Sequence, residues 1–179
     1  MRPRFRFPDD RGRDRKRNSD FIAKFIKPNS SEEEIIRLLE EALNHYKDVK
    51  LVKDCAKKLG LRLRQLEENE KLELYFDVFK DGRTICCIYK GWGDSGFRLS
   101  EHLAIDKTTP GFKDKFYEIF RVCSKNLVNV GITEQDKRNI WLSFEIGIYR
   151  DGFNDKVLRE AIADFEDAMS KVKDLLNNG

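Results

Sequence analysis

The stretch LELYFDVFKDGRTICCIYK, residues 72–90, decides the fold that we expect for this chain. Its first part alternates apolar and polar residues, which is typical of a strand with one buried face. Asp81-Gly82 then supplies the positive φ angles of a tight hairpin turn, and an apolar run, Thr84–Lys90, follows it. The sequence therefore predicts an antiparallel hairpin, formed by two strands of an antiparallel sheet.

A long helical pattern precedes this hairpin. Ser30 or Ser31 can cap a helix, and Glu33 or Glu34 can complete a capping box. Apolar residues then recur at steps of three and four up to Gly60, a natural helix stop. This pattern predicts one helix, or two helices broken near 47–50, with a single buried face: Ile35, Leu39, Ala42, Tyr46, Val49, Val52, Ala56 and Leu59.

Residues 91–111 have the composition of a loop, in which a short strand or a helical turn could occupy Phe97–Ile105. An amphipathic helix is expected from about residue 112 to residue 128. A polar turn at Thr133–Asn139 and an alternating strand at Ile140–Ile148 follow it.

The last helix is expected to begin after Asn154, whose side chain can cap it. Its core face comprises Leu158, Ala161, Ile162, Phe165, Met169, Val172 and Leu176. The fold class that follows is α+β, with an antiparallel sheet of four to five strands covered on one face by three amphipathic helices. We expect a basic disordered arm at residues 1–18, a short helical linker at 19–30 and a single α+β domain at 31–179.

The order α-β-β-β-α-β-α between residues 31 and 176 resembles the type III secretion chaperone fold, and particularly its YbjN-like relatives. The stretch Ile140–Tyr149, followed by Arg150-Asp151-Gly152 and a helix from Asp155, carries the resemblance. The resemblance implies a non-enzymatic, often dimeric, protein-binding module with one further strand within Val128–Thr133. It transfers no catalytic residues.

The first eighteen residues carry eight basic and three acidic side chains, a net charge of +5, whereas the whole chain carries +3. A slightly acidic body with a cationic arm is typical of an interaction tail. Arginines can lie along phosphates, and phenylalanines can stack on unpaired bases. The predicted nucleic-acid-binding residues are Arg2, Arg4, Phe5, Arg6, Phe7, Arg11, Arg13, Arg15, Lys16 and Arg17. The arm could equally be a solubilising tail.

The four cysteines, Cys55, Cys86, Cys87 and Cys123, form no C-x-x-C pair, and the chain has only two histidines. We therefore expect reduced core thiols, a cytoplasmic protein and no zinc site. We also expect neither a membrane span, a secretory signal nor a mitochondrial presequence.

The segment Gly91–Gly96 matches two motifs as a string, G-x-G-x-x-G and Gly-Asp-Ser-Gly. A dinucleotide site would need a helix opening at the third glycine, and a serine nucleophile would need a histidine base beside Ser95. Neither context is expected here, so we predict no cofactor. The segment is instead interpreted as a flexible connection or as a loop that presents Trp92 to a partner.

The function predicted from these features is that of a non-catalytic adaptor whose arm contacts nucleic acid, with RNA favoured over DNA in a ribonucleoprotein. The alternative is a chaperone-like protein-binding module in which the arm is only a solubilising tail. In both cases a protein partner binds the α+β domain, and a homodimer is compatible with the sequence.

Overall fold

The computed structural model describes residues 26–65, 73–91 and 94–177. The chain divides into two compact units, residues 1–49 and residues 50–179. Helix α2 (Glu32–Lys58) begins in the first unit and ends in the second.

The described part of the first unit is a turn followed by most of α2. The backbone amide of Ser30 donates to the carbonyl of Lys27 at 3.0 Å. Residues 26–30 thus form a turn around Pro28, and residues 19–25 of the predicted helical linker lie outside the described residues. The hydroxyl of Ser31 accepts from the amide of Glu34 at 3.2 Å, which confirms Ser31 as a cap. α2 is unbroken, so the single-helix alternative is the correct one.

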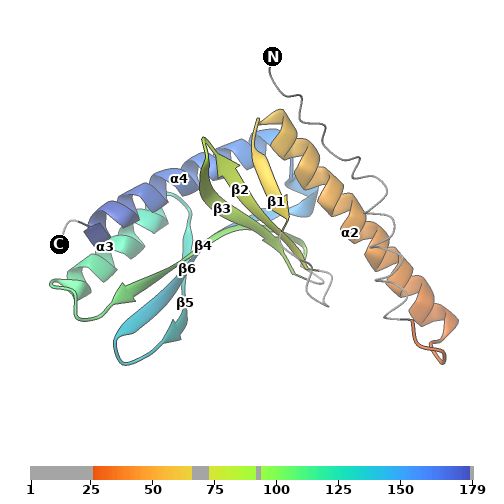
Figure 1. Ribbon diagram of the computed structural model, residues 1–179, viewed down its shortest axis with the longest axis horizontal. Helices are drawn as coiled ribbons and strands as arrows, with labels where there is room; N and C mark the ends of the chain where they lie inside the picture. Colours follow the sequence, from red (N-terminus) through yellow and green to blue (C-terminus); the bar gives the residue numbers. More distant parts are fainter. Residues whose placement is uncertain (1–25, 66–72, 92–93, 178–179) are drawn as a thin grey trace, which may run out of the picture. The chain divides into compact units, whose positions relative to one another are not determined.

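The second unit contains a six-stranded antiparallel sheet, in which the strands lie in the order β1-β2-β3-β4-β6-β5 (Figure 1). The α+β class is therefore confirmed, with six strands in place of the expected four to five. The strands are β1 (Arg62–Gln65), β2 (Leu74–Lys80), β3 (Arg83–Lys90), β4 (Gly96–Asp106), β5 (Asn129–Gln135) and β6 (Asn139–Tyr149). The helices of this unit are α3 (Phe112–Lys125) and α4 (Asp155–Asn177), and a 3-10 turn, η1 (Arg150–Gly152), precedes α4.

The hairpin that the sequence predicts is present between β2 and β3. Asp81 and Gly82 have φ angles of 51° and 78°, as a turn with two left-handed residues requires. The strand alternative for Phe97–Ile105 is correct, but the strand is longer than expected. It is β4 (Gly96–Asp106), in which Phe97, Leu99 and Ile105 alternate with polar residues and which pairs with β6 along its whole length. The turn expected at Thr133–Asn139 is shorter than expected. Residues 133–135 belong to β5, and the turn is confined to 136–138.

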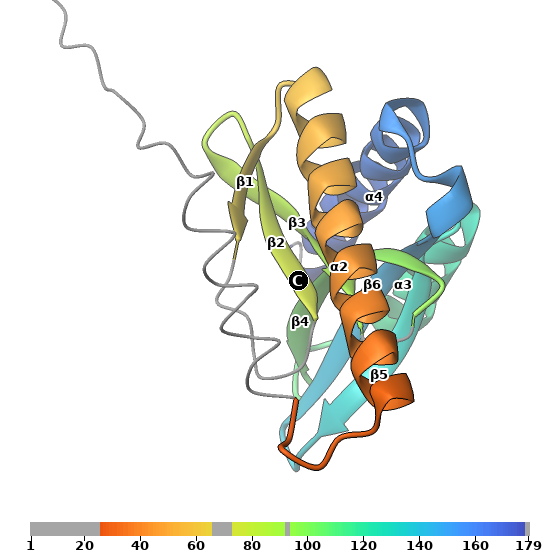
Figure 2. The same cartoon turned by 90° about the vertical axis from the view of Figure 1, so that its right-hand side faces the viewer.

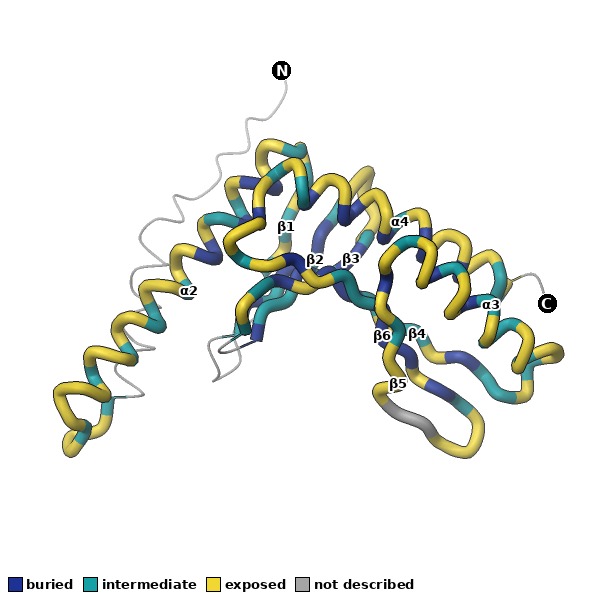
Figure 3. Tube along the Cα trace, turned by 180° about the vertical axis from the view of Figure 1, so that it is seen from behind, coloured by how far each residue is buried: buried dark blue, intermediate teal, exposed yellow. Residues whose placement is uncertain are grey.

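α3 and α4 contact each other, and α4 also contacts β4 and β6 (Figures 1 and 2). The side chain of Asn154 accepts from the amide of Val157 at 3.0 Å, which confirms the predicted cap of α4. The predicted core face of α4 is buried from Leu158 to Val172, and Leu176 is half-buried. Buried positions alternate with more exposed ones along β2, whereas β6 has three consecutive buried residues, Leu142–Phe144, at its centre (Figure 3).

The expected single buried face of α2 is correct only in its second part. Val49, Val52 and Ala56 are buried, whereas Leu39 and Tyr46 are exposed. Gly60 ends the helix with a φ of 68°, and the amide of Leu61 donates to the carbonyl of Ala56 at 2.9 Å. This is the reverse turn that a glycine after a helix favours.

Candidate functional site: a groove at the free edge of β6

The two edges of β6 have different partners. On one side, β4 pairs with β6 from Gly96↔Tyr149 to Asp106↔Asn139. On the other side, β5 pairs with β6 only as far as Asn129↔Glu145. Residues 146–149 therefore have a strand neighbour on one side alone within the described parts of the chain.

The hydrogen bonds between β4 and β6 show in which direction the backbone amide and carbonyl groups at this edge point. The amide of Arg150 donates to the carbonyl of Ser95 at 3.0 Å, on the β4 side of β6. Amide and carbonyl groups of successive residues in a strand point to alternate sides. Those of Gly147 and Tyr149 therefore point away from β4, toward the free edge.

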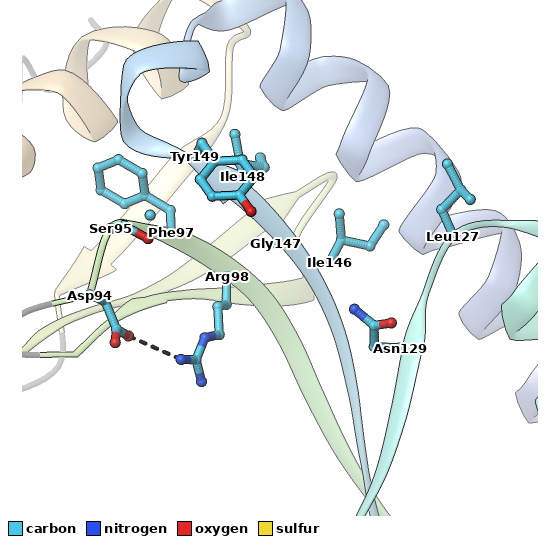
Figure 4. A pocket seen from close by; sticks show the side chains of 11 residues that line it. Asp94, Ser95, Phe97, Arg98, Leu127, Asn129, Ile146, Gly147, Ile148 and Tyr149 are labelled. Atoms are coloured by element: carbon cyan, nitrogen blue, oxygen red, sulfur yellow. Dashed lines mark hydrogen bonds and ion pairs between the residues drawn. The ribbon is translucent and has the colours of Figure 1, made fainter.

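A groove with a volume of about 410 Å³ lies at this edge. Its lining comes from three segments, namely residues 94–98, residues 146–149, and Leu127 with Asn129. Figure 4 shows Asn129 at the start of β5 and Leu127 in the turn before it, both beside the end of β6. The groove is thus bounded by a strand edge on one side and by the turn between α3 and β5 on the other.

Leu127 forms one wall of the groove in an unusual conformation. It has a φ of 56°, in the left-handed region that a leucine rarely adopts, and it is 79% exposed. The amide of Val128 donates to the carbonyl of Cys123 at 2.9 Å, so Leu127 stands where a helix end normally has glycine. The chain therefore holds a large apolar side chain in solvent at a position where glycine would be more stable.

The opposite rim carries an arginine whose charge is balanced locally. The guanidinium of Arg98 lies 3.2 Å from Asp94 and 4.0 Å from Glu145. It also lies 5.9 Å from the centre of the Tyr89 ring. Burial, followed by the charge of Glu73, raises the pKa of Tyr89, so its phenol stays neutral at physiological pH. This rim therefore offers polar contacts without a net positive field.

The floor of the groove is rigid. Phe97 and Ile148 are buried, and the ring of Phe97 lies 4.3 Å from that of Phe153. A β-carbon on Gly96 would lie 2.4 Å from the carbonyl oxygen of Ile148, so glycine allows the close approach of β4 and β6. A β-carbon on Gly147 would meet nothing within 4 Å.

The residues of the groove do not form a reactive centre. Ser95 immediately precedes β4, and His102 is seven residues further along the chain, which corresponds to about 23 Å in an extended strand. Gly96 opens a strand and not a helix, so the glycine-rich segment lacks the helix N-terminus of a dinucleotide site. In the described ranges no group of three or more histidine, cysteine and acidic residues could hold a metal ion.

The cysteines are not activated nucleophiles. All four are free, and Cys55, Cys86 and Cys123 are buried. Burial raises the pKa of Cys87 to about 12 and that of Cys123 to about 11. A thiolate is the reactive form, so these groups are inert near neutral pH.

The residues that line the groove differ from the binding residues that the sequence predicted. The predicted nucleic-acid-binding residues between Arg2 and Arg17, and the predicted partner-binding Trp92, lie outside the described residues. Sequence reasoning missed Leu127, Asn129 and Tyr149. Gly147 was a usable signal, because an isolated glycine inside a strand pattern often marks a close backbone approach.

The comparisons with known proteins extend the description of the fold alone. No family model matches the chain, and no curated protein matches it. An uncharacterized protein from Methanothermobacter thermautotrophicus has a similar structure, with a TM-score of 0.57 and 11% sequence identity. The similarity covers 72% of this chain and 96% of that one. Among the described residues, no helix combines the length and the apolarity needed to cross a membrane.

Proposed function

We propose that this protein is a non-catalytic binding module that takes up an extended segment of a partner protein as a strand beside β6. The observation that carries the proposal is the free edge at residues 146–149. There the backbone groups of Gly147 and Tyr149 point into a groove instead of toward a neighbouring strand. Such edges bind peptides through main-chain hydrogen bonds, and nearby pockets select the side chains.

The shape of the groove sets the kind of segment that fits. Leu127 and Ile146 supply apolar surface, whereas Asn129 and Arg98 supply polar groups. A bound strand would therefore need an apolar side chain near Leu127 and Ile146, with neutral polar residues on the other side. Within the described parts of the chain, four residues of β6, 146–149, lack a second strand neighbour, so we expect a transient complex with a dissociation constant on the order of 1–100 μM.

The conformation of Leu127 supports a binding role for this wall. A non-glycine residue in the left-handed region costs roughly 1 kcal/mol, and such strain is concentrated at functional positions. A leucine that is both strained and 79% exposed contributes little to the stability of the free protein. In the proposed complex, this side chain would contact the bound segment and be removed from solvent.

We also propose that the helices cover only one face of the sheet, so that the face carrying Arg98 and Tyr89 stays accessible to the partner. We further propose that the chain is not an enzyme. A protein-binding role is what the resemblance to type III secretion chaperones implies.

The test uses the full chain and linear peptides selected against it from a random library. Gly147→Pro removes the amide that would donate to the bound strand, and proline is tolerated at a strand edge. Gly147→Ala is the matched control, because it keeps the amide and its β-carbon meets no other atom. We expect Gly147→Pro to weaken peptide binding at least tenfold in fluorescence anisotropy, and Gly147→Ala to change it less than twofold.

Leu127→Gly gives a second, independent test. It should raise the stability of the free protein by about 1 kcal/mol and weaken peptide binding, because glycine relieves the strain but removes the wall. If the selected peptides bind Gly147→Pro and Leu127→Gly as tightly as the original protein, strand addition at β6 is wrong.

Nucleic-acid binding through the arm is a second candidate, favoured by the net charge of +5 in residues 1–18. The arginine at the groove is balanced by two carboxylates, so the arm would supply the affinity for phosphate. With four to six phosphate contacts, the affinity for single-stranded RNA should fall with salt at a log–log slope of about −3 to −5.

This candidate is tested on the full chain with Arg11, Arg13, Arg15 and Arg17 replaced by glutamine. RNA affinity should fall and its salt dependence should flatten, whereas peptide binding should not change. Absence of RNA binding by the original chain at low salt would contradict the candidate.

A further inference from the structure

The first part of α2 carries an apolar stripe that the described structure leaves in solvent. Four large side chains form it, with exposed fractions of 49%, 46%, 53% and 46%: Ile36, Leu39, Leu43 and Tyr46, here called the α2 stripe. Single exposed apolar residues are common on protein surfaces, but a continuous row of four marks an interaction surface.

The spacing of the α2 stripe is that of a helix–helix seam. Its members follow one another at steps of three, four and three residues, as the a and d positions of two heptads do. This order of steps reads the same in both directions along the helix. A two-fold axis between Leu39 and Leu43 would therefore superimpose the stripe on itself, as an interface between identical subunits requires.

The charges beside the α2 stripe favour one orientation. The first turn is acidic, with Glu32, Glu33 and Glu34, whereas Lys47 lies at the other end of the stripe, and all four side chains are exposed. A parallel pair would place the acidic turns of the two helices against each other. An antiparallel pair would place Glu33 of each helix opposite Lys47 of the other, where opposite charges attract, so that two attractive pairs outweigh the single repulsive contact between the two exposed Glu40 side chains near the axis.

We propose that two copies of this chain associate through the α2 stripe as an antiparallel helix pair. Ile36 then faces Tyr46 of the other copy, and Leu39 faces Leu43. The partner is thus a second copy of this chain, and the contact is separate from the β6 groove. A seam of two heptads is shorter than a standard protein interface, so we expect a dissociation constant on the order of 10–100 μM.

Sedimentation of the full chain between about 2 and 500 μM tests association. The average mass should rise from 21.1 kDa toward twice that value. Leu39→Lys with Leu43→Lys should keep the protein monomeric throughout, and the exposure of both side chains means that folding should survive, which circular dichroism checks. A monomer at every concentration, or a dimer that tolerates both lysines, overturns the proposal.

Two further variants test the orientation. Lys47→Glu should raise the dissociation constant roughly fivefold, and adding Glu33→Lys should restore it, because the swap rebuilds both ion pairs. In a Cys87→Ser background, a mixture of Leu39→Cys and Leu43→Cys chains should form a mixed disulfide dimer, since the antiparallel seam brings these positions together. Cross-linking of Leu39→Cys chains to each other in preference to the mixed pair overturns the antiparallel arrangement.

Discussion

Gly96 and Gly147 lie on adjacent strands at the groove, but they should respond in opposite ways to the same substitution. A β-carbon on Gly96 would lie 2.4 Å from the carbonyl oxygen of Ile148 and 3.1 Å from the α-carbon of Tyr149. Both are backbone atoms and cannot rotate away. A β-carbon on Gly147 would have no atom within 4 Å. Alanine should therefore clash with the backbone at position 96 and cause no clash at position 147.

The size of the difference follows from these distances. Carbon and oxygen atoms in ordinary contact are about 3.5 Å apart, so Gly96→Ala must push β4 and β6 apart by roughly 1 Å. Overpacking of this kind costs about 1–3 kcal/mol, occasionally more. Gly147→Ala should be neutral or stabilise by up to about 1 kcal/mol, because alanine restricts the unfolded chain. The two variants should thus differ by about 1–4 kcal/mol.

Urea denaturation of the full chain measures this difference. The midpoint should fall for Gly96→Ala and stay or rise for Gly147→Ala, with the same slope against urea for both. Gly96→Ala should also weaken peptide binding at the groove, because the end of β6 moves. If Gly96→Ala is as stable as Gly147→Ala, the close approach of β4 and β6, and the rigid floor that we infer from it, are wrong.

Three other predictions concern the rest of the second unit. Leu158→Ala removes a fully buried side chain from α4 and should cost about 2–5 kcal/mol, measured as a fall in the urea midpoint. The thiol of Cys87 should react with a disulfide reagent at pH 8 far more slowly than a free cysteine, because burial raises its pKa to about 12; rapid reaction of the native protein would refute this. Hydrogen bonds from Thr108 and then Arg138 lower the pKa of Asp106 to about 2, so their stabilisation is complete above pH 4 and is lost as the pH falls through 2; Thr108→Ala should raise this pKa in a carboxyl NMR titration.

Much of the fold could be predicted because its signals are local. Asp81-Gly82 fixes a hairpin through its own backbone angles, and Ser31 and Asn154 cap helices within three residues of themselves. The alternation from Ile140 to Ile148 needs only a sheet with a buried face. These features depend on neighbours in the chain, so the sequence alone was sufficient to predict them.

The errors have a common cause in contacts between distant segments. The sequence left a strand and a helical turn as alternatives within residues 91–111, and the strand forms because β6, more than thirty residues later, pairs with all of it. The apolar pattern of α2 looked uniform, but burial depends on what covers a helix, and Leu39 and Tyr46 are left in solvent.

The sequence by itself determined the α+β class, the hairpin, two of the helix caps and the cationic character of residues 1–18, but it placed the end of α3 about three residues too late. Only the tertiary structure decided that β5 begins at Asn129, so that its pairing with β6 ends at Glu145 and leaves the groove beside residues 146–149. The physical reason is that a strand edge is free only where no neighbouring strand pairs with it, and this depends on segments that are distant in the sequence. Gly147 and Leu127 line the same groove because the pairing between β5 and β6 ends at Asn129↔Glu145.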